Sequence, residues 1–218
     1  MKALIILSSS SRIVMFVTSI ICLYNGIKYY NKIKSIKGFI FLSLLSIADS
    51  LSYIYLVIIE KNKTTFYKIS EQTQILYHVV EIGVILYFFI SKNYDQKVLI
   101  KKHKTLIFAL LTLLYLYNIL IQSTNTFLIL SELIIVNTLC INYFFSIYKK
   151  KISQIDTHKY LINGLFIFIN ITAPYYILEN NIEKTTPFLI SYINFINDLG
   201  YTILFLSINK EVKWIALK

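Results

Sequence analysis

Hydrophobic residues fall into seven long runs, and short clusters of lysine separate these runs. The runs occupy residues 13–27, 38–59, 73–91, 105–121, 127–148, 160–178 and 188–208. Each is near the length of about 20 residues that a helix needs to cross the hydrocarbon of a bilayer, and none alternates as a membrane barrel strand does. Because a lipid-exposed backbone must satisfy its own polar groups, helices are favoured. The pattern predicts one all-α domain over residues 1–218, a polytopic integral membrane bundle of seven transmembrane helices.

The composition supports a membrane location. Of the 218 residues, 56% are hydrophobic and 15% are charged, whereas about a quarter of the residues in an average soluble domain are charged. This balance excludes an ordinary water-soluble globule, and seven spans leave no room for a separate soluble domain. Abundant Ile, Asn, Lys and Tyr, whose codons are AT-rich, indicate a bacterial genome. Cys22 and Cys140 lie inside apolar runs, so we expect buried thiols and no disulfide.

Lysine and arginine are divided unevenly between the two ends of the predicted spans. The connections after the first, third and fifth spans and the C-terminal tail carry 16 of the 22 basic residues. Because positively charged loops stay in the cytoplasm, we expect the N-terminus outside and the C-terminus in the cytoplasm. These clusters account for the net charge of +11 without nucleic acid, and their expected partner is the lipid bilayer. The prediction is a multi-pass protein of the bacterial inner (cytoplasmic) membrane.

Ionisable side chains interrupt the apolar spans and define a candidate site. A carboxylate at the centre of a span costs about 2.5 to 3.5 kcal/mol on insertion scales, so acids at this depth usually face one another, a cavity or a partner. Helical spacing places Asn194 on the same face as Asp198. We expect a polar interior that is open to the outside and binds a ligand or a cation, lined by Asp49, His78, Glu81, Glu132, Asn194 and Asp198.

Three further residues receive structural roles. Arg12, near the outer end of the first span, is a candidate counter-charge for Glu132 or Glu81. Small residues permit close approach of membrane helices, and we expect this role for Gly83 and Gly164.

The C-terminal tail on the cytoplasmic side is predicted to carry nothing enzymatic. His158 lies in a basic loop, and residues 209–218 read as a short segment on the anionic inner leaflet. Retinal binding requires a lysine in the middle of the seventh helix, whereas Lys210 lies at its cytoplasmic end. Ceramidase-like hydrolases place several histidines around zinc, and the chain lacks those histidines. Both of these seven-helix classes are disfavoured.

Three functions fit an acid-lined interior. A sensor would bind a small cationic or polyhydroxylated molecule and bias the packing of the helices. A cation- or proton-coupled transporter or channel would use the acids as relays. A membrane-embedded metal-dependent hydrolase would use His78 and Glu81, whose spacing is half of a helical metal site. The structural alternative is interhelical hydrogen bonding, worth about 0.6 to 2 kcal/mol for each contact.

Short motifs in four spans resemble those of one group of proteins. They are Ile47-Ala48-Asp49, Tyr77-His78-Val79-Val80-Glu81, Ser131-Glu132-Leu133 and Asn163-Gly164. With the order of the spans, these motifs resemble a family of uncharacterised seven-helix integral membrane proteins of Bacteroidota. The resemblance implies the seven-helix fold and the acidic positions, and it implies no activity. The seventh span departs from this group, with Ser191 and Asn194 where Asn and His are usual and Asp198 where Asn is usual.

Taken together, the sequence favours a non-catalytic inner-membrane sensor or accessory subunit. With no cytoplasmic output domain expected, such a protein signals through a partner membrane or cytoplasmic protein. We expect no catalytic residue, no metal and no cofactor. The alternatives are the transporter or channel and, after it, the metal-dependent hydrolase.

Overall fold

The computed structural model describes residues 2–33, 36–59, 77, 80–89, 126–148, 158–182 and 187–217. Within these ranges the chain is helical with short turns and contains no strand, which confirms the all-α prediction for this part of the protein. The elements are α1 (Lys2–Lys28), α2 (Lys37–Tyr53), the π-helix η2 (Ile54–Ile59), α5 (Thr126–Tyr148), α6 (Lys159–Ile182) and α7 (Pro187–Leu217). A further helix, Val80–Phe89, belongs to the predicted third span. The predicted fourth span, 105–121, lies outside the described residues.

Two helices extend beyond the apolar runs that predicted them. α1 begins at residue 2 rather than 13, because the serines before the run are compatible with a helix. The Ser11 hydroxyl oxygen also lies 2.8 Å from the Ser8 carbonyl oxygen one turn earlier, a contact that serines make within helices. α7 continues to Leu217, and Val212 in this extension is fully buried. Residues 209–217 are therefore the end of a packed helix, whereas the seventh apolar run ended at residue 208.

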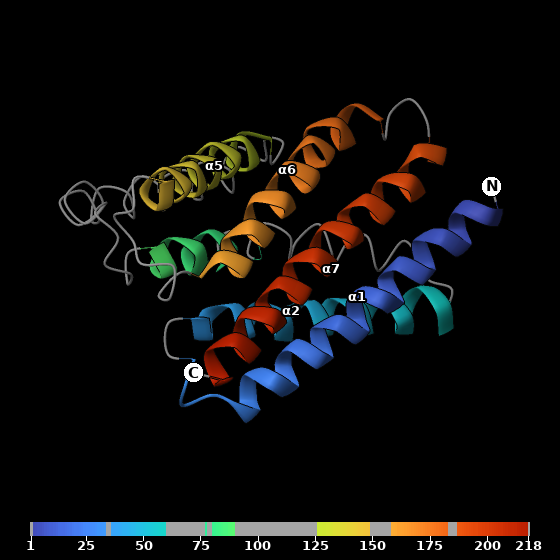
Figure 1. The fold of residues 1–218 in the computed structure, drawn as a ribbon. Helices are drawn as coiled ribbons and strands as arrows, with labels where there is room; N and C mark the ends of the chain where they lie inside the picture. The colour runs from blue at the N-terminus through green and yellow to red at the C-terminus, as the bar shows by residue number, and fades with distance from the viewer. Residues whose placement is uncertain are drawn as a thin grey trace.

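α7 lies between α1 and α6, while α2 packs against α1 and α5 against α6 (Figure 1). The contacts between α1 and α7 advance together along both helices. Ser11 donates to Asp198 at 2.9 Å, and Asn25 donates to Asn209 at 2.7 Å. α1 and α7 are therefore parallel. α2 is antiparallel to α1, and α6 is antiparallel to α7.

The helix Val80–Phe89 runs in the same direction as α7. Near its start, Glu81 accepts a hydrogen bond from the Tyr201 hydroxyl at 3.3 Å. Near its end, the Phe88 ring lies 5.3 Å from the ring of His158, and His158 bonds to Glu211, which is ten residues beyond Tyr201 in α7. This helix is consequently parallel to α1 and antiparallel to α2.

Glycine permits close contact between α6 and α7. A Cβ atom at Gly164 would collide with the side chain of Ser207, and one at Gly200 would lie 2.5 Å from the methyl group of Thr172. The predicted role of Gly164 is confirmed. The same prediction for Gly83 is wrong within the described structure, because a Cβ atom there meets nothing within 4 Å.

Among the described residues, two helical stretches are long and apolar enough to cross a membrane, Ser8–Lys28 and Lys37–Val57. Only 28% of each is buried inside the molecule, whereas the core helix of a soluble domain would be mostly buried. Their outer faces carry large apolar side chains such as Val14 and Ile27, which are 51% and 65% exposed. These faces are compatible with a lipid environment.

Candidate functional site

A single arginine joins two carboxylates from different helices. The Arg12 Nη1 atom of α1 lies 2.6 Å from the Asp49 Oδ2 atom of α2, and its Nε atom lies 3.4 Å from the Asp198 Oδ1 atom of α7. The Asp198 side chain is only 1% exposed, whereas that of Asp49 is 35% exposed. One edge of the site is therefore open, and the other is enclosed by protein.

Neighbouring polar groups orient this ion-pair network. The Ser11 hydroxyl donates to the second carboxylate oxygen of Asp198 at 2.9 Å. The Arg12 guanidinium carbon lies 5.3 Å from the centre of the Tyr53 ring, a distance typical of a cation–π contact. The Tyr53 hydroxyl in turn lies 3.4 Å from the Ser9 hydroxyl. We call Ser9, Ser11, Arg12, Asp49, Tyr53 and Asp198 the Arg12 cluster.

The chemistry of arginine explains why this residue occupies the centre. Arg12 is the only arginine in the sequence, the other basic residues being lysines. A guanidinium is planar, stays charged and offers several N–H donors in a fixed fork, so it can bind two carboxylates at once. Arg12 pairs with Asp49 and Asp198 rather than with Glu132 or Glu81, the partners expected from the sequence. Its uniqueness among the basic residues was the signal that could have shown its role.

Of the other predicted acids, Glu81 lies near this cluster and Glu132 lies elsewhere. Glu81 is 1% exposed and is bound by the hydroxyl of Tyr201, which follows Asp198 by one helical turn on α7. Glu132 is also 1% exposed, but it belongs to α5, whose main packing partner is α6. The structure thus joins Asp49 and Asp198 through Arg12 and places Glu81 against Tyr201 of α7.

The other two predicted site residues have different outcomes. Asn194 is half-buried and lies one turn before Asp198 on α7, as the helical spacing predicted. His78 lies outside the described residues, so its pairing with Glu81 stays a prediction. Within the described residues, no three His, Cys, Asp or Glu side chains are grouped closely enough to hold a metal ion.

Ser46, a buried serine of α2, lies at the same depth as Glu81. The Phe39 and Phe88 rings meet edge to face at 5.6 Å between centroids. Ser46 follows Phe39 by seven residues and Glu81 precedes Phe88 by seven, so the equal rise of two antiparallel helices brings them level. Ser50 lies one turn beyond Ser46 on the same buried face.

Three oxygen atoms near this depth can accept hydrogen bonds from a bound molecule. The Oγ atoms of Ser46 and Ser50 and the Oδ1 atom of Asn197 are buried and, among the described residues, have no hydrogen-bond partner. Asn197 lies beside Asp198 and one turn before Tyr201 on α7. Buried polar atoms normally have a hydrogen-bond partner, so these three can bind a polar or cationic molecule. We call Ser46, Ser50, Glu81, Asn197 and Tyr201 the polar layer.

A second buried polar pair, not predicted from the sequence, lies at the other end of the bundle. The His158 Nδ1 atom lies 3.1 Å from the Glu211 Oε1 atom, and their residues are 5% and 1% exposed. The other Glu211 oxygen accepts the backbone N–H groups of Tyr160 and Leu161 at 3.2 and 3.4 Å. Glu211 therefore caps the start of α6. His158 precedes α6, as a residue of the predicted basic loop would, but its side chain is buried.

The missed pair was signalled by the periodicity of α7. Leu204, Ile208, Glu211 and Ile215 recur at intervals of four, three and four residues, so Glu211 continues the buried face of the helix. Lys210 and Lys213 flank Glu211, and this charge favoured a segment outside the apolar span. The apolar periodicity that continues through Glu211 was therefore not used.

Comparison of the chain with protein-family models, curated proteins and solved structures finds no match. The resemblance to the seven-helix family of Bacteroidota therefore stays a prediction, and functional reasoning depends on the geometry of the site.

Proposed function

We propose that this chain is a non-catalytic sensor or accessory subunit of the bacterial inner membrane. In this proposal it is a seven-helix bundle that binds a small cationic or polyhydroxylated molecule and acts through a partner protein. The observation that carries the proposal is the Arg12 cluster, in which one guanidinium connects carboxylates from α2 and α7 to α1.

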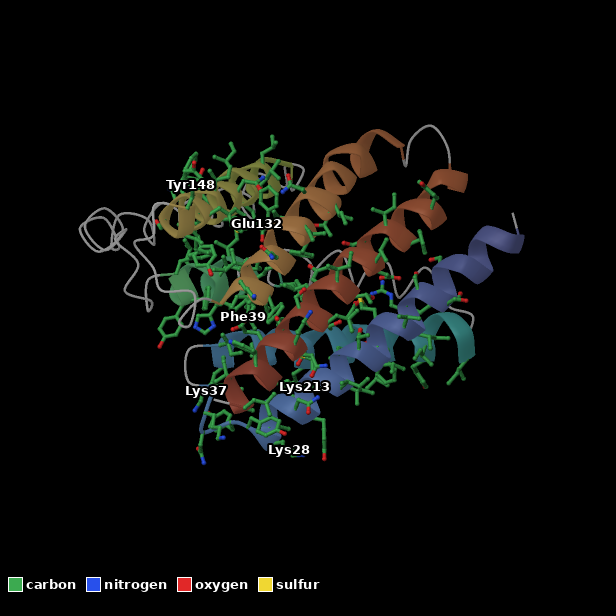
Figure 2. All side chains as sticks on the ribbon, viewed as in Figure 1. Lys28, Lys37, Phe39, Glu132, Tyr148 and Lys213 are labelled. Atoms are coloured by element: carbon green, nitrogen blue, oxygen red, sulfur yellow. The ribbon has the colours of Figure 1, made fainter. Side chains whose placement is uncertain are left out.

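The directions of the helices support the proposed threading. α1 and α7 are parallel. If both cross the bilayer, they cross it in the same sense, and the total number of crossings is then odd. Seven crossings, with the N-terminus outside and the C-terminus in the cytoplasm, satisfy this condition. Lys28, Lys37 and Lys213 lie together at one end of the bundle (Figure 2), which agrees with a cytoplasmic basic side.

The charges of the site favour a cationic or hydroxylated ligand. Asp49 and Asp198 share one guanidinium, and Glu81 lies at the depth of the neighbouring polar layer. Incompletely balanced buried acids are costly, and a cation relieves that cost. The hydroxyl groups of the polar layer and the Asn197 oxygen offer donors and acceptors to a polyhydroxylated molecule. Because Asp49 is 35% exposed, a ligand entering the site meets it before the enclosed Asp198.

Ligand binding has a direct route to helix movement. A ligand that takes over Asp49 competes with Arg12 and weakens the attachment of α2 to α1. The π-helix η2 follows Tyr53 directly, and π-turns are frequent at functional sites. A ligand shifts a conformational equilibrium only by its differential affinity for the two arrangements, and Asp49 supplies this difference when it exchanges Arg12 for the ligand.

The proposal is tested by ligand-dependent stability. Full-length protein in detergent is heated with a polyamine, a quaternary ammonium compound or a disaccharide, since a ligand of the native state raises the unfolding temperature with concentration. At least one class is expected to stabilise the wild type. Asp49→Asn and Asp198→Asn should lower its affinity at least tenfold, whereas Glu132→Gln, an equally buried acid in α5, should keep it. Equal loss in all three variants, or no response to any class, would contradict the proposal.

A small cation- or proton-coupled transporter is the second candidate. The observation that favours it is the number of acids that are only 1% exposed in the described structure, namely Glu81, Glu132, Asp198 and Glu211. Cation and proton flux into liposomes containing the protein separates the two functions. Flux that is lost in both Glu81→Gln and Asp198→Asn supports transport. Flux no greater than that of empty liposomes supports the sensor or subunit.

A further inference from the structure

Lysines gather at the end of the bundle opposite the Arg12 cluster. They come from the end of α1, the start of α2, the start of α6 and the end of α7, and three of them are labelled in Figure 2. The described side chains are Lys28, Lys32, Lys37, Lys159, Lys210 and Lys213. Within the described part of this end, the one acid is Glu211, which is 1% exposed and bound to His158 and the start of α6. The surface there is consequently cationic.

Two of these lysines share one aromatic ring between α6 and α7. The Lys210 Nζ atom lies 4.3 Å and the Lys159 Nζ atom 5.2 Å from the centre of the Tyr160 ring. The Trp214 ring meets the Tyr160 ring edge to face at 6.3 Å, and Trp214 is 39% exposed. We call Lys159, Tyr160, Lys210 and Trp214 the Tyr160 clamp.

The clamp differs from the other basic contacts at this end. The Lys37 Nζ atom lies 3.3 Å from the centre of the Tyr30 ring, a contact of one ammonium group with one ring. The Lys32 ammonium group donates to the Ala216 carbonyl oxygen at 2.8 Å. In the clamp two exposed ammonium groups share a single ring, which neutralises neither of them. An anion placed between these ammonium groups would interact with both charges at once.

We propose that the Tyr160 clamp binds the phosphate headgroup of an anionic phospholipid of the cytoplasmic leaflet. Basic pockets between transmembrane helices on the cytoplasmic side bind anionic headgroups, and tyrosine and tryptophan prefer the depth at which those headgroups lie. The lysines bind the phosphate, while the Trp214 ring contacts the glycerol and the upper acyl chain. This inference rests on the membrane threading proposed above and is independent of ligand sensing at the Arg12 cluster.

Trp214 is the only tryptophan in the chain, so its fluorescence reports on this site alone. Full-length protein in detergent is titrated with phosphatidylglycerol or cardiolipin whose acyl chains carry bromine, a contact quencher, and with brominated phosphatidylcholine. The anionic lipids are expected to quench Trp214 at concentrations about tenfold lower than phosphatidylcholine requires at low salt. High salt should reduce this difference, because the attraction is electrostatic.

Paired substitutions distinguish a built site from diffuse attraction. Lys159→Gln with Lys210→Gln is expected to raise the half-quenching concentration of anionic lipid about tenfold, and Lys→Arg at both positions to restore it. Lys28→Gln with Lys37→Gln removes the same charge from the same end and should change it less than about threefold. Equal quenching by all lipids, or equal loss in the two Gln pairs, would overturn the clamp while leaving the threading intact. In a further measurement, the protein is reconstituted into bilayers that contain the brominated lipids. If none of these lipids quenches Trp214, the proposed threading at this end is overturned as well.

Discussion

At the scale of single residues, Arg12 determines the character of the candidate site. Its side chain is 14% exposed, and its guanidinium reaches two carboxylates that come from two other helices, α2 and α7. A lysine at this position would carry the same charge, but it would lack the planar fork that binds both partners. The same residue therefore stabilises the packing of three helices and limits the negative charge of the interior.

Replacement of Arg12 separates these contributions. Arg12→Gln leaves the buried Asp198 carboxylate without its counter-charge, so the free energy of unfolding should fall by roughly 2 to 4 kcal/mol. Arg12→Lys should recover part of this loss. Arg12→Gln combined with Asp198→Asn should be less destabilised than the sum of the two single variants, since the second change removes the isolated charge. Denaturant unfolding in detergent measures all four proteins, and a loss below about 0.5 kcal/mol in Arg12→Gln would show that the ion pairs are incidental.

At the scale of elements, the contact between α6 and α7 places the site. Gly164 and Gly200 allow these helices to approach, and α7 then presents Asp198 and Tyr201 to its other neighbours. The cap that Glu211 supplies to α6 adds a polar contact at the end of the same interface. The position of Asp198 thus depends on Gly200, two residues further along α7, and on Gly164 of α6, which packs against Ser207.

The two glycines that the sequence treated alike should respond differently to alanine. Gly164→Ala places a Cβ atom against the Ser207 side chain and should destabilise the protein by about 1 to 3 kcal/mol through overpacking. Gly83→Ala meets open space and should be neutral or stabilising by up to about 1 kcal/mol, because alanine favours the helix. Thermal unfolding of the two variants under identical conditions provides the comparison. Similar destabilisation in both would argue against the described packing of α6 on α7.

At the scale of the whole molecule, α1 and α7 are parallel. In the proposed threading, this direction places the two ends of the chain on opposite sides of the bilayer. Lys28, Lys37 and Lys213 form the basic end of the bundle. The Arg12 cluster lies at a different depth along α1 and α7. In the proposed threading, the ligand site faces the outside and the Tyr160 clamp faces the cytoplasm.

Cysteine labelling tests this orientation. A membrane-impermeant maleimide is applied to intact bacterial spheroplasts. It should modify the Ser10→Cys variant directly, because residue 10 is exposed and, in the proposed threading, lies outside. It should modify the Leu217→Cys variant, at a position 86% exposed, only after the membrane is permeabilised. The native Cys22 and Cys140 are free thiols but 0% exposed, so the wild-type protein should give little background. Labelling of both engineered cysteines from the same side would exclude an odd number of crossings.

The sequence by itself determined the all-helical nature of the described chain, the approximate bounds of α2, α5 and α6, and the burial of Glu81, Glu132 and Asp198. These properties follow from hydrophobic periodicity and from the local spacing of side chains along a helix, which need no knowledge of neighbouring helices. The helix face that Asn194 shares with Asp198 was predictable for the same reason.

Only the tertiary structure decided which charges meet. Arg12 is 37 residues from Asp49 and 186 from Asp198, and no local rule selects these partners over Glu81 or Glu132. The pairing depends on which helices are neighbours and on their relative rotation and register, which result from packing of the whole bundle. Glu211 and His158 became a buried pair for the same reason, because the end of α7 packs over the start of α6 and removes both side chains from water.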